Sequence, residues 1–319
     1  MNNSAKSLRE SSDRDCLRDN TGLIASLACL WEASARKVGN VHPRADFANT
    51  NYCHFATSAL AVYSAFLYVS NNTSIGRIVS SAIDRTRLIV GQNTNLGIML
   101  LLAPLAKAGG GWSPLENRPV GGIYDIREEL PSVLQGTTIE DADDVFRAIR
   151  DCNPGGLGEV SHHDVRKQAT ITLLEAMKKA ADRDLIARQY ANNFADVFDL
   201  GIPALLESFA KYGCVEAAII HCHFTWLAHF PDTLIVRKND LATAEVVQRR
   251  ADDIFRCGGL ATSAGRAAGV ALDAYLRSDG NRLNPGTSAD LVAACLFVAL
   301  REGKLPLNAP FPWQVEDWL

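Results

Sequence analysis

Apolar residues at helical spacing recur along almost the whole chain, and this periodicity is its most restrictive feature. Alternating runs of Val, Ile and Thr bounded by tight turns, which mark strands, are nearly absent. Two segments, 55–68 and 291–300, are apolar on every side, as expected for the central helices of a large bundle. The sequence therefore predicts an all-α fold with buried central helices.

The predicted helices have lengths that are ordinary for globular proteins, with boundaries set to within a few residues. The expected ranges are 20–36, 54–70, 74–90, 95–108, 139–151, 161–178, 183–198, 203–211, 214–229, 241–257, 259–276 and 288–302. The Gly/Pro-rich segment 109–120 is expected to form a surface loop or lid. The tail 304–319 is expected to pack Trp313 and Trp318 on the surface of the bundle.

Length and composition allow a single large core. The chain has 319 residues and 47% hydrophobic content, and about 150 residues per domain would allow one or two domains. No shift in composition accompanies the 109–120 segment. We therefore expect one domain over residues 1–319, with a helical core at about 20–303.

Charge and cysteine usage narrow the classes of partner. The net charge is −4 and no Lys/Arg tract occurs, so nucleic acid is not an expected partner and a small ligand is. The apolar stretches fall short of the roughly 18 residues that a membrane span needs, and the N-terminus lacks an apolar signal, which predicts a soluble, cytoplasmic protein without a membrane partner. The eight cysteines contain no C-x-x-C pair, so we expect neither disulfides nor structural zinc. The oligomeric state stays open.

Two polar triplets, Asn49-Thr50-Asn51 and Asn93-Thr94-Asn95, each stand just before a long apolar helical run. Asn and Thr are ordinary helix N-caps, which is one reading of each triplet. Free N–H groups at a helix start together with amides also form a natural seat for phosphate. Because the arrangement occurs twice, we favour a ligand site.

Further polar side chains gather at the ends of the predicted helices. The groups are Glu32 with Lys37, Asn40 and Asp46; Asp182 with Asp184; Asp232 with Arg237 and Lys238; and Asp290. Singly, each fits a turn, a solvated face or a capping-box acid. Together they supply hard oxygen ligands for Mg²⁺ and cations for phosphates, so the sequence predicts a Mg²⁺-nucleotide site.

An ordered set of motifs gives the chain a family resemblance. The motifs are Lys37-Val-Gly-Asn40-Val-His42, Phe55-x-x-Ser58-Ala59, Asn93-Thr-Asn-Leu-Gly97, Pro154-Gly-Gly-Leu-Gly158, Asp232-Thr-Leu-Ile-x-Arg237-Lys238 and Asn284-Pro-Gly-Thr-x-Ala-Asp290. From about residue 32 to 300 the chain resembles the triphosphoribosyl-dephospho-CoA synthase family. The resemblance implies an all-helical, Mg²⁺-dependent transferase that passes the triphosphoribosyl group of ATP to the 2′-hydroxyl of 3′-dephospho-CoA and releases adenine.

Departures from the family pattern concern the acceptor. Where the family tends to show Gly-Ala-His-x-Asp-Met-Asp, this chain has Phe47 in place of the His and Asn49 and Asn51 in place of the two acids. It resembles a divergent branch in archaea and in bacteria that use pterin-linked one-carbon carriers. The alternatives are therefore phosphoribosyl-type transfer in the synthesis of a methanopterin- or methanofuran-like carrier, and a non-catalytic nucleotide-binding protein.

Cleavage of a ribosyl C–N bond builds positive charge on the sugar, so the site needs a carboxylate, a proton donor for the leaving base and a base for the acceptor hydroxyl. For catalysis we expect Asp46 and Asp290. For nucleotide and phosphate binding we expect Lys37, Asn40, Asn49, Asn93, Thr94, Asn95, Arg237 and Lys238. For the metal we expect Asp46, Asp182 and Asp232, with Mg²⁺ as cofactor and ATP as substrate.

Overall fold

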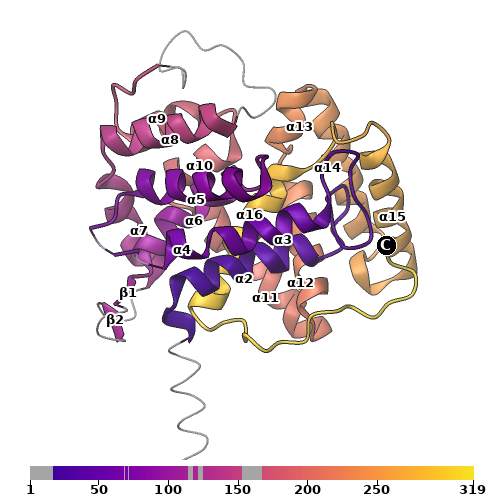
Figure 1. Ribbon diagram of the computed structural model, residues 1–319. Coiled ribbons are helices and arrows are strands. Elements are labelled where there is room, and N and C mark those ends of the chain that lie inside the picture. Colours follow the sequence, from indigo (N-terminus) through magenta and orange to yellow (C-terminus); the bar gives the residue numbers. More distant parts are fainter. Residues whose placement is uncertain (1–16, 68, 71, 114–117, 121–124, 153–166) are drawn as a thin grey trace, which may run out of the picture.

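A computed structural model describes residues 17–67, 69–70, 72–113, 118–120, 125–152 and 167–319, and Figure 1 shows the arrangement of its helices. Within these ranges the helices and strands are all helices apart from one short hairpin, in which β1 (Gly111–Ser113) pairs antiparallel with β2 (Arg118–Val120). The all-α prediction is thus confirmed, although the hairpin lies where a loop was expected. No helix in the described ranges combines the length and apolarity of a membrane span.

Seven helices of the first half of the chain lie wholly within the described residues. They are α2 (Thr21–Ser34), α3 (Tyr52–Ala61), α4 (Tyr63–Phe66), α5 (Ile75–Val90), α6 (Leu96–Ala108), α7 (Ile126–Gln135) and α8 (Ile139–Cys152). The remainder contains α9 (Leu173–Ala180), α10 (Leu185–Ala191), η1 (Val197–Gly201), α11 (Ile202–Tyr212), α12 (Val215–His229), α13 (Thr233–Lys238), α14 (Leu241–Arg256), η2 (Gly259–Ala261), α15 (Ser263–Arg277) and α16 (Gly286–Arg301).

The centre of the bundle is built on α16 and α6. Every residue of α16 from Leu291 onward is buried, and α16 packs against α2, α6 and α12 (Figure 1). Nearly every residue of α6 is buried too. A helix that is apolar on all sides must be enclosed by others, so these two runs determine where the core lies.

The other apolar run, 55–68, is not a central helix, and that expectation is wrong. It is divided at Val62 between α3 and α4, and Leu60 is 69% exposed. The prediction failed because small residues and Tyr fill much of this segment. Such residues occur on buried and on exposed faces alike, so they do not indicate which faces of the helix other helices cover.

A second hydrophobic cluster joins α12, α14 and α15 to the tail that follows α16. Trp313 and Trp318 are 7% and 4% exposed and belong to this cluster. The tail thus packs both tryptophans against the bundle, as expected, and its contacts with Tyr212, Phe224 and Gly269 bury them. The expectation of one domain stays a prediction.

Helices α7 and α13 were not predicted. α7 contains Pro131 and has a first turn rich in acids, and α13 has only six residues, so neither shows a long apolar period. α9 begins at Leu173, later than the expected helix 161–178, part of which lies outside the described residues. The Pro154-Gly-Gly-Leu-Gly158 motif also lies outside them.

Candidate functional site

Asp290 occupies the second turn of α16, at the centre of the molecule. Its side chain is partly buried and, among the described residues, makes no hydrogen bond or ion pair. Burial, and next the negative charges of Glu32 and Asp232, raise the pKa of Asp290 well above its usual range, while Arg237 acts in the opposite direction. Asp290 is not a capping-box acid, because α16 begins at Gly286 without a side-chain cap. Its carboxyl group is therefore free for other chemistry.

Gly97 makes room for this carboxyl group. A Cβ atom at position 97 would lie 2.0 Å from Oδ2 of Asp290, closer than two such atoms can approach. Gly97 lies in the first turn of α6, where the backbone N–H groups carry partial positive charge. The Asp290 carboxyl group is therefore directed at the N-terminal end of the buried helix α6.

Glu32, whose negative charge raises the pKa of Asp290, belongs to a buried ion pair. Nζ of Lys37 is 2.8 Å from Oε1 of Glu32, and also donates to the main-chain oxygen of Glu32. The lysine is fully buried and the glutamate nearly so. Glu32 was noticed in the sequence but given no role. Glu32 could have been identified as a candidate site residue because it is the only charged residue in the apolar helix α2.

A second ion pair, partly exposed, is formed by two residues whose charges act on the pKa of Asp290. Nη1 of Arg237 on α13 lies 3.1 Å from Oδ2 of Asp184, and the Nε atom of Arg237 is buried without a partner. Oδ1 of Asp184 caps α10 by accepting from the N–H groups of Ile186 and Ala187. The sequence prediction selected Asp182, which is exposed in the preceding turn. Asp184 could have been found by its position directly before an apolar run.

Asp232 is used as a clamp between α13 and α16. Its Oδ1 accepts from the N–H groups of Leu234 and Ile235, and its Oδ2 accepts from the N–H and hydroxyl groups of Ser288. Burial raises the pKa of Asp232, although these hydrogen bonds act in the opposite direction. Both oxygens are engaged, so metal binding by Asp232 would require some of these bonds to break.

Lys238, the last residue of α13, bonds a main-chain oxygen and none of the acids around Asp290. Its Nζ donates to the main-chain oxygen of Asn281 at 2.9 Å. Burial lowers the pKa of Lys238. Its expected contact with phosphate stays a prediction.

The two polar triplets are brought together, but much of their chemistry is capping. The side chain of Asn51 accepts from the N–H of His54 in a capping box for α3. Oδ1 of Asn93 accepts from the N–H groups of Asn95 and Leu96, at 3.3 and 3.1 Å. These two asparagines thus follow the capping interpretation of the triplets.

Thr94 joins the second triplet to helix α3, and Asn95 has a different environment from the capping asparagines. The hydroxyl of Thr94 bonds that of Ser58 on α3. Asn95 is 3% exposed, its Nδ2 donates to the hydroxyl of Thr86, and its Oδ1 has no partner. A buried acceptor without a donor is costly unless a ligand or water supplies one. Asn95 is therefore the triplet residue best suited to contact a ligand. Asn49 is exposed.

Asn40 and Asp46 lie on the segment between α2 and α3. Nδ2 of Asn40 donates to Asn284 at 2.7 Å, and its buried Oδ1 has no partner. Asp46 is exposed, and its Oδ1 accepts from the N–H of Tyr52 at the start of α3. Phe47, which stands at the family's His position, lies 5.6 Å from the guanidinium of Arg277.

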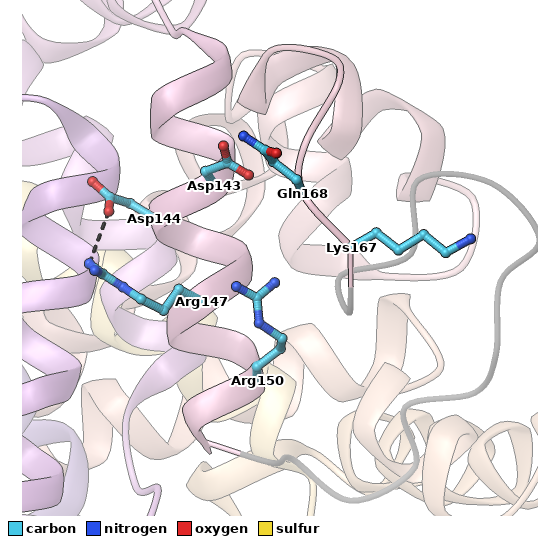
Figure 2. A pocket seen from close by; sticks show the side chains of 6 residues that line it. All are labelled: Asp143, Asp144, Arg147, Arg150, Lys167 and Gln168. Carbon is cyan, nitrogen blue, oxygen red and sulfur yellow. Dashed lines mark hydrogen bonds and ion pairs between the residues drawn. The ribbon is translucent and has the colours of Figure 1, made fainter.

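The structure groups only some of the predicted site residues. The charges of two predicted site residues, Asp232 and Arg237, act on the pKa of Asp290. The charges of Glu32 and Asp184, which were not among the predicted site residues, act on it as well. In the described parts of the chain, no three His, Cys, Asp or Glu side chains are close enough together to hold a metal ion. A separate surface hollow of about 450 Å³ lies between α8 and the segment before α9, and it is lined by Asp143, Asp144, Arg147, Arg150, Lys167 and Gln168 (Figure 2). None of the predicted site residues lines it.

Comparisons with known proteins place these residues in a family. The model of the ATP:dephospho-CoA triphosphoribosyl transferase family matches residues 18–308. A 2-(5''-triphosphoribosyl)-3'-dephosphocoenzyme-A synthase of Klebsiella pneumoniae is 31% identical over 113 residues, which is 35% of this chain and 40% of that protein. A relative in Acinetobacter calcoaceticus, to which the same activity is attributed, is 32% identical over 34% of this chain and 37% of its own length. The chain thus spans less than half of these curated relatives.

A solved structure covers more of the chain. The crystal structure of a protein assigned as a triphosphoribosyl-dephospho-CoA synthase from Archaeoglobus fulgidus is 30% identical and has a TM-score of 0.59. The match covers 77% of this chain and 98% of that one, so the helical architecture is shared nearly throughout the smaller protein. With the family model matching most of its length, this chain belongs to the ATP:dephospho-CoA triphosphoribosyl transferase family.

Proposed function

We propose that this protein catalyses the Mg²⁺-dependent transfer of the triphosphoribosyl group of ATP to the 2′-hydroxyl of 3′-dephospho-CoA, with release of adenine. Membership of the family supports the classes of donor and acceptor. The observation that carries the proposal is the Asp290 carboxyl group, which has no partner among the described residues although it is desolvated and surrounded by other acids. A group in that condition is a typical catalytic acid.

The transfer moves one proton as well as one sugar. When the bond between C1′ and the adenine nitrogen breaks, the electron pair leaves with adenine, which needs a proton, and the ribosyl group gains positive charge. The acceptor oxygen then bonds to C1′ and its hydroxyl proton is lost. Asp290 in its protonated form donates to adenine, and the proton from the acceptor hydroxyl restores it. The neighbouring carboxylates Glu32 and Asp184 stabilise the positive charge on the sugar.

The unpartnered buried atoms supply contacts for the nucleotide. Nε of Arg237 is a free donor, and charge-assisted bonds from Arg to phosphate are strong and directional. Oδ1 of Asn95 and Oδ1 of Asn40 are free acceptors that suit ribose hydroxyl groups. Lys37 adds positive charge from its buried pair with Glu32. Asn49, Thr94 and Lys238 are kept as weaker members of the same proposed set, whereas Asn93 serves as a cap and is left out of it.

Magnesium would come with the triphosphate. Proteins usually hold Mg²⁺ through one or two carboxylates together with phosphate oxygens, and the ion neutralises phosphate charge. Asp46 and Asp182 are exposed and keep oxygens that accept no hydrogen bond, so both fit this use. Asp232 fits less well, because all of its bonding positions toward α13 and α16 are taken. We therefore propose Asp46 and Asp182 ahead of Asp232.

The segment around Phe47 favours a second candidate, a phosphoribosyl-type transfer to a different acceptor. The family's acids at positions 49 and 51 are amides here, and Asn51 serves to cap α3. Loss of two charges and a histidine would change recognition of the acceptor without removing Asp290 or Arg237. The second candidate is transfer to a hydroxyl of a methanopterin- or methanofuran-like carrier.

Product analysis with adenine-labelled ATP tests the proposal. We expect free adenine and a dephospho-CoA product whose mass is raised by one triphosphoribosyl group. Adenine release that requires a pterin-type acceptor, or pyrophosphate release from a phosphoribosyl donor, would support the second candidate instead. Tight binding of Mg-ATP without turnover with any acceptor would contradict both and indicate a non-catalytic nucleotide-binding protein.

A further inference from the structure

Residues 306–319, which we call the strap, cross one end of the bundle without forming a helix or strand (Figure 1). The main-chain oxygens of Pro310 and Phe311 accept from the N–H groups of Val215 and Glu216, at 2.8 and 3.0 Å. These donors belong to the first turn of α12, which has no side-chain cap. The strap therefore satisfies the free end of a buried helix.

Arg36 is held between α12 and the strap. Its guanidinium makes a two-pronged pair with Glu216, at 2.7 and 2.9 Å. It also donates to the main-chain oxygens of Trp313 at 2.6 Å and Leu319 at 2.9 Å. Both charged side chains are buried. A buried pair keeps one geometry when its remaining donors are also satisfied, as they are here.

Trp318 holds the main chain of Arg36 as well. Its Nε1 donates to the Arg36 oxygen at 3.1 Å. The ring packs edge-on against Phe224 at 6.0 Å, and a Cβ at Gly269 would lie 2.8 Å from it. The indole therefore has one well-defined position. Side chain and main chain of Arg36 are both fixed by the strap.

Arg36 directly precedes Lys37, and both lie where the chain leaves α2. Lys37 has no exposed surface and pairs with Glu32 on the last turn of that helix. Any shift of the Arg36 main chain is passed to Lys37 through one peptide unit, which is planar and stiff. We propose that the strap sets the position of the Lys37–Glu32 pair beside Asp290, with Arg36 and Trp318 as positioning residues. This inference rests on the proposed function.

Two matched substitutions separate positioning from general stability. Trp318→Phe removes the donor to Arg36 but keeps an aromatic ring. Trp313→Phe shortens a neighbouring ring of the strap. The Trp313 ring packs against Tyr212 and Trp318, at centroid distances of 6.1 and 5.8 Å. The bond from Arg36 to the main-chain oxygen of residue 313 stays in place in this variant. We expect kcat for adenine release to fall about tenfold to a hundredfold in Trp318→Phe, as small misplacements do, and to stay near the parent value in Trp313→Phe. Melting curves for both variants identify any loss that is due to unfolding.

The inference is overturned if Trp318→Phe keeps the parent kcat, or if both variants lose activity only in proportion to the folded fraction. A second readout needs no turnover. Lys37 in the folded protein is labelled by reductive methylation with formaldehyde, and its modification is followed by mass spectrometry. We expect labelling about two- to twelvefold faster in Trp318→Phe, the effect of one lost hydrogen bond on local opening, and no change in Trp313→Phe. Unchanged labelling would refute the inference. A parent that releases no adenine would refute the proposed function, and the labelling would still decide the role of the strap.

Discussion

Replacing Asp290 by Asn should make the protein more stable at neutral pH. Burial and the charges of Glu32 and Asp232 raise the pKa of Asp290 well above its usual range, so ionising this group in the folded state is costly. An amide has the shape of the protonated acid and never ionises. The substitution therefore removes a destabilising charge and fills the same space against Gly97.

The sign and size of the effect follow from the two pKa values of Asp290. Its folded pKa is raised above the unfolded value of about 3.9, so the stabilising contribution of the protonated form is fully present below that pH. It is lost as the pH rises toward the folded pKa. Over this window the unfolding free energy of the parent should fall relative to Asp290→Asn by about 1.4 kcal/mol for each pH unit.

Urea unfolding of both proteins at a series of pH values from about 4 to 8 measures this difference. Subtracting one curve from the other removes the titration of the acids that do not interact with Asp290, because both proteins share them. Equal stability of the two proteins at every pH would refute the reasoning. A variant that is less stable than the parent at pH 8 would also refute it, since that result requires a stabilising partner for the ionised carboxylate.

Three further substitutions test the surroundings of this group. Asn93→Ala should lower the unfolding free energy by about 0.5–2 kcal/mol, the usual value of an N-cap, and leave the affinity for Mg-ATP unchanged in calorimetric titration. Asn95→Ala should weaken Mg-ATP binding by roughly 0.5–1.5 kcal/mol, and a variant that binds like the parent would remove Asn95 from the site. Gly97→Ala should destabilise the protein by about 1–3 kcal/mol and reduce turnover, because its methyl group would meet Asp290; a parent-like melting curve would show that the two do not touch.

The fold was predictable where the apolar runs were long and enclosed. Leu291–Leu300 and the run after Asn95 had to be buried, and they form α16 and α6. Short elements such as α13 carry no period to detect and depend on tertiary contacts, here the clamp from Asp232 to Ser288. The buried tail was also beyond reach, because nothing in its sequence says that Arg36, more than 250 residues earlier, would bind it.

The site was predictable as a set of residue types but not as an arrangement. Asp290 and Arg237 were both predicted from the sequence, and the charge of Arg237 acts on the pKa of Asp290. Asp184 was passed over in favour of Asp182, because helix order does not reveal which of two neighbouring acids turns inward. Likewise Asn93 and Asn95 have the same chemistry in the sequence. Only the backbone geometry makes one a cap and leaves the other with a free buried oxygen.

The rate of adenine release, measured side by side for the parent, Asp290→Asn and Asp253→Asn, tests the central claim most directly. With Mg-ATP and dephospho-CoA at saturating concentrations, we expect Asp290→Asn to lose about 10²- to 10⁴-fold, the range for loss of a catalytic acid. Asp253 is exposed on α14 and has no place in the proposed site, so Asp253→Asn is the matched control for removal of one negative charge and should keep nearly the parent rate. Release of adenine by Asp290→Asn at the parent rate would contradict the account.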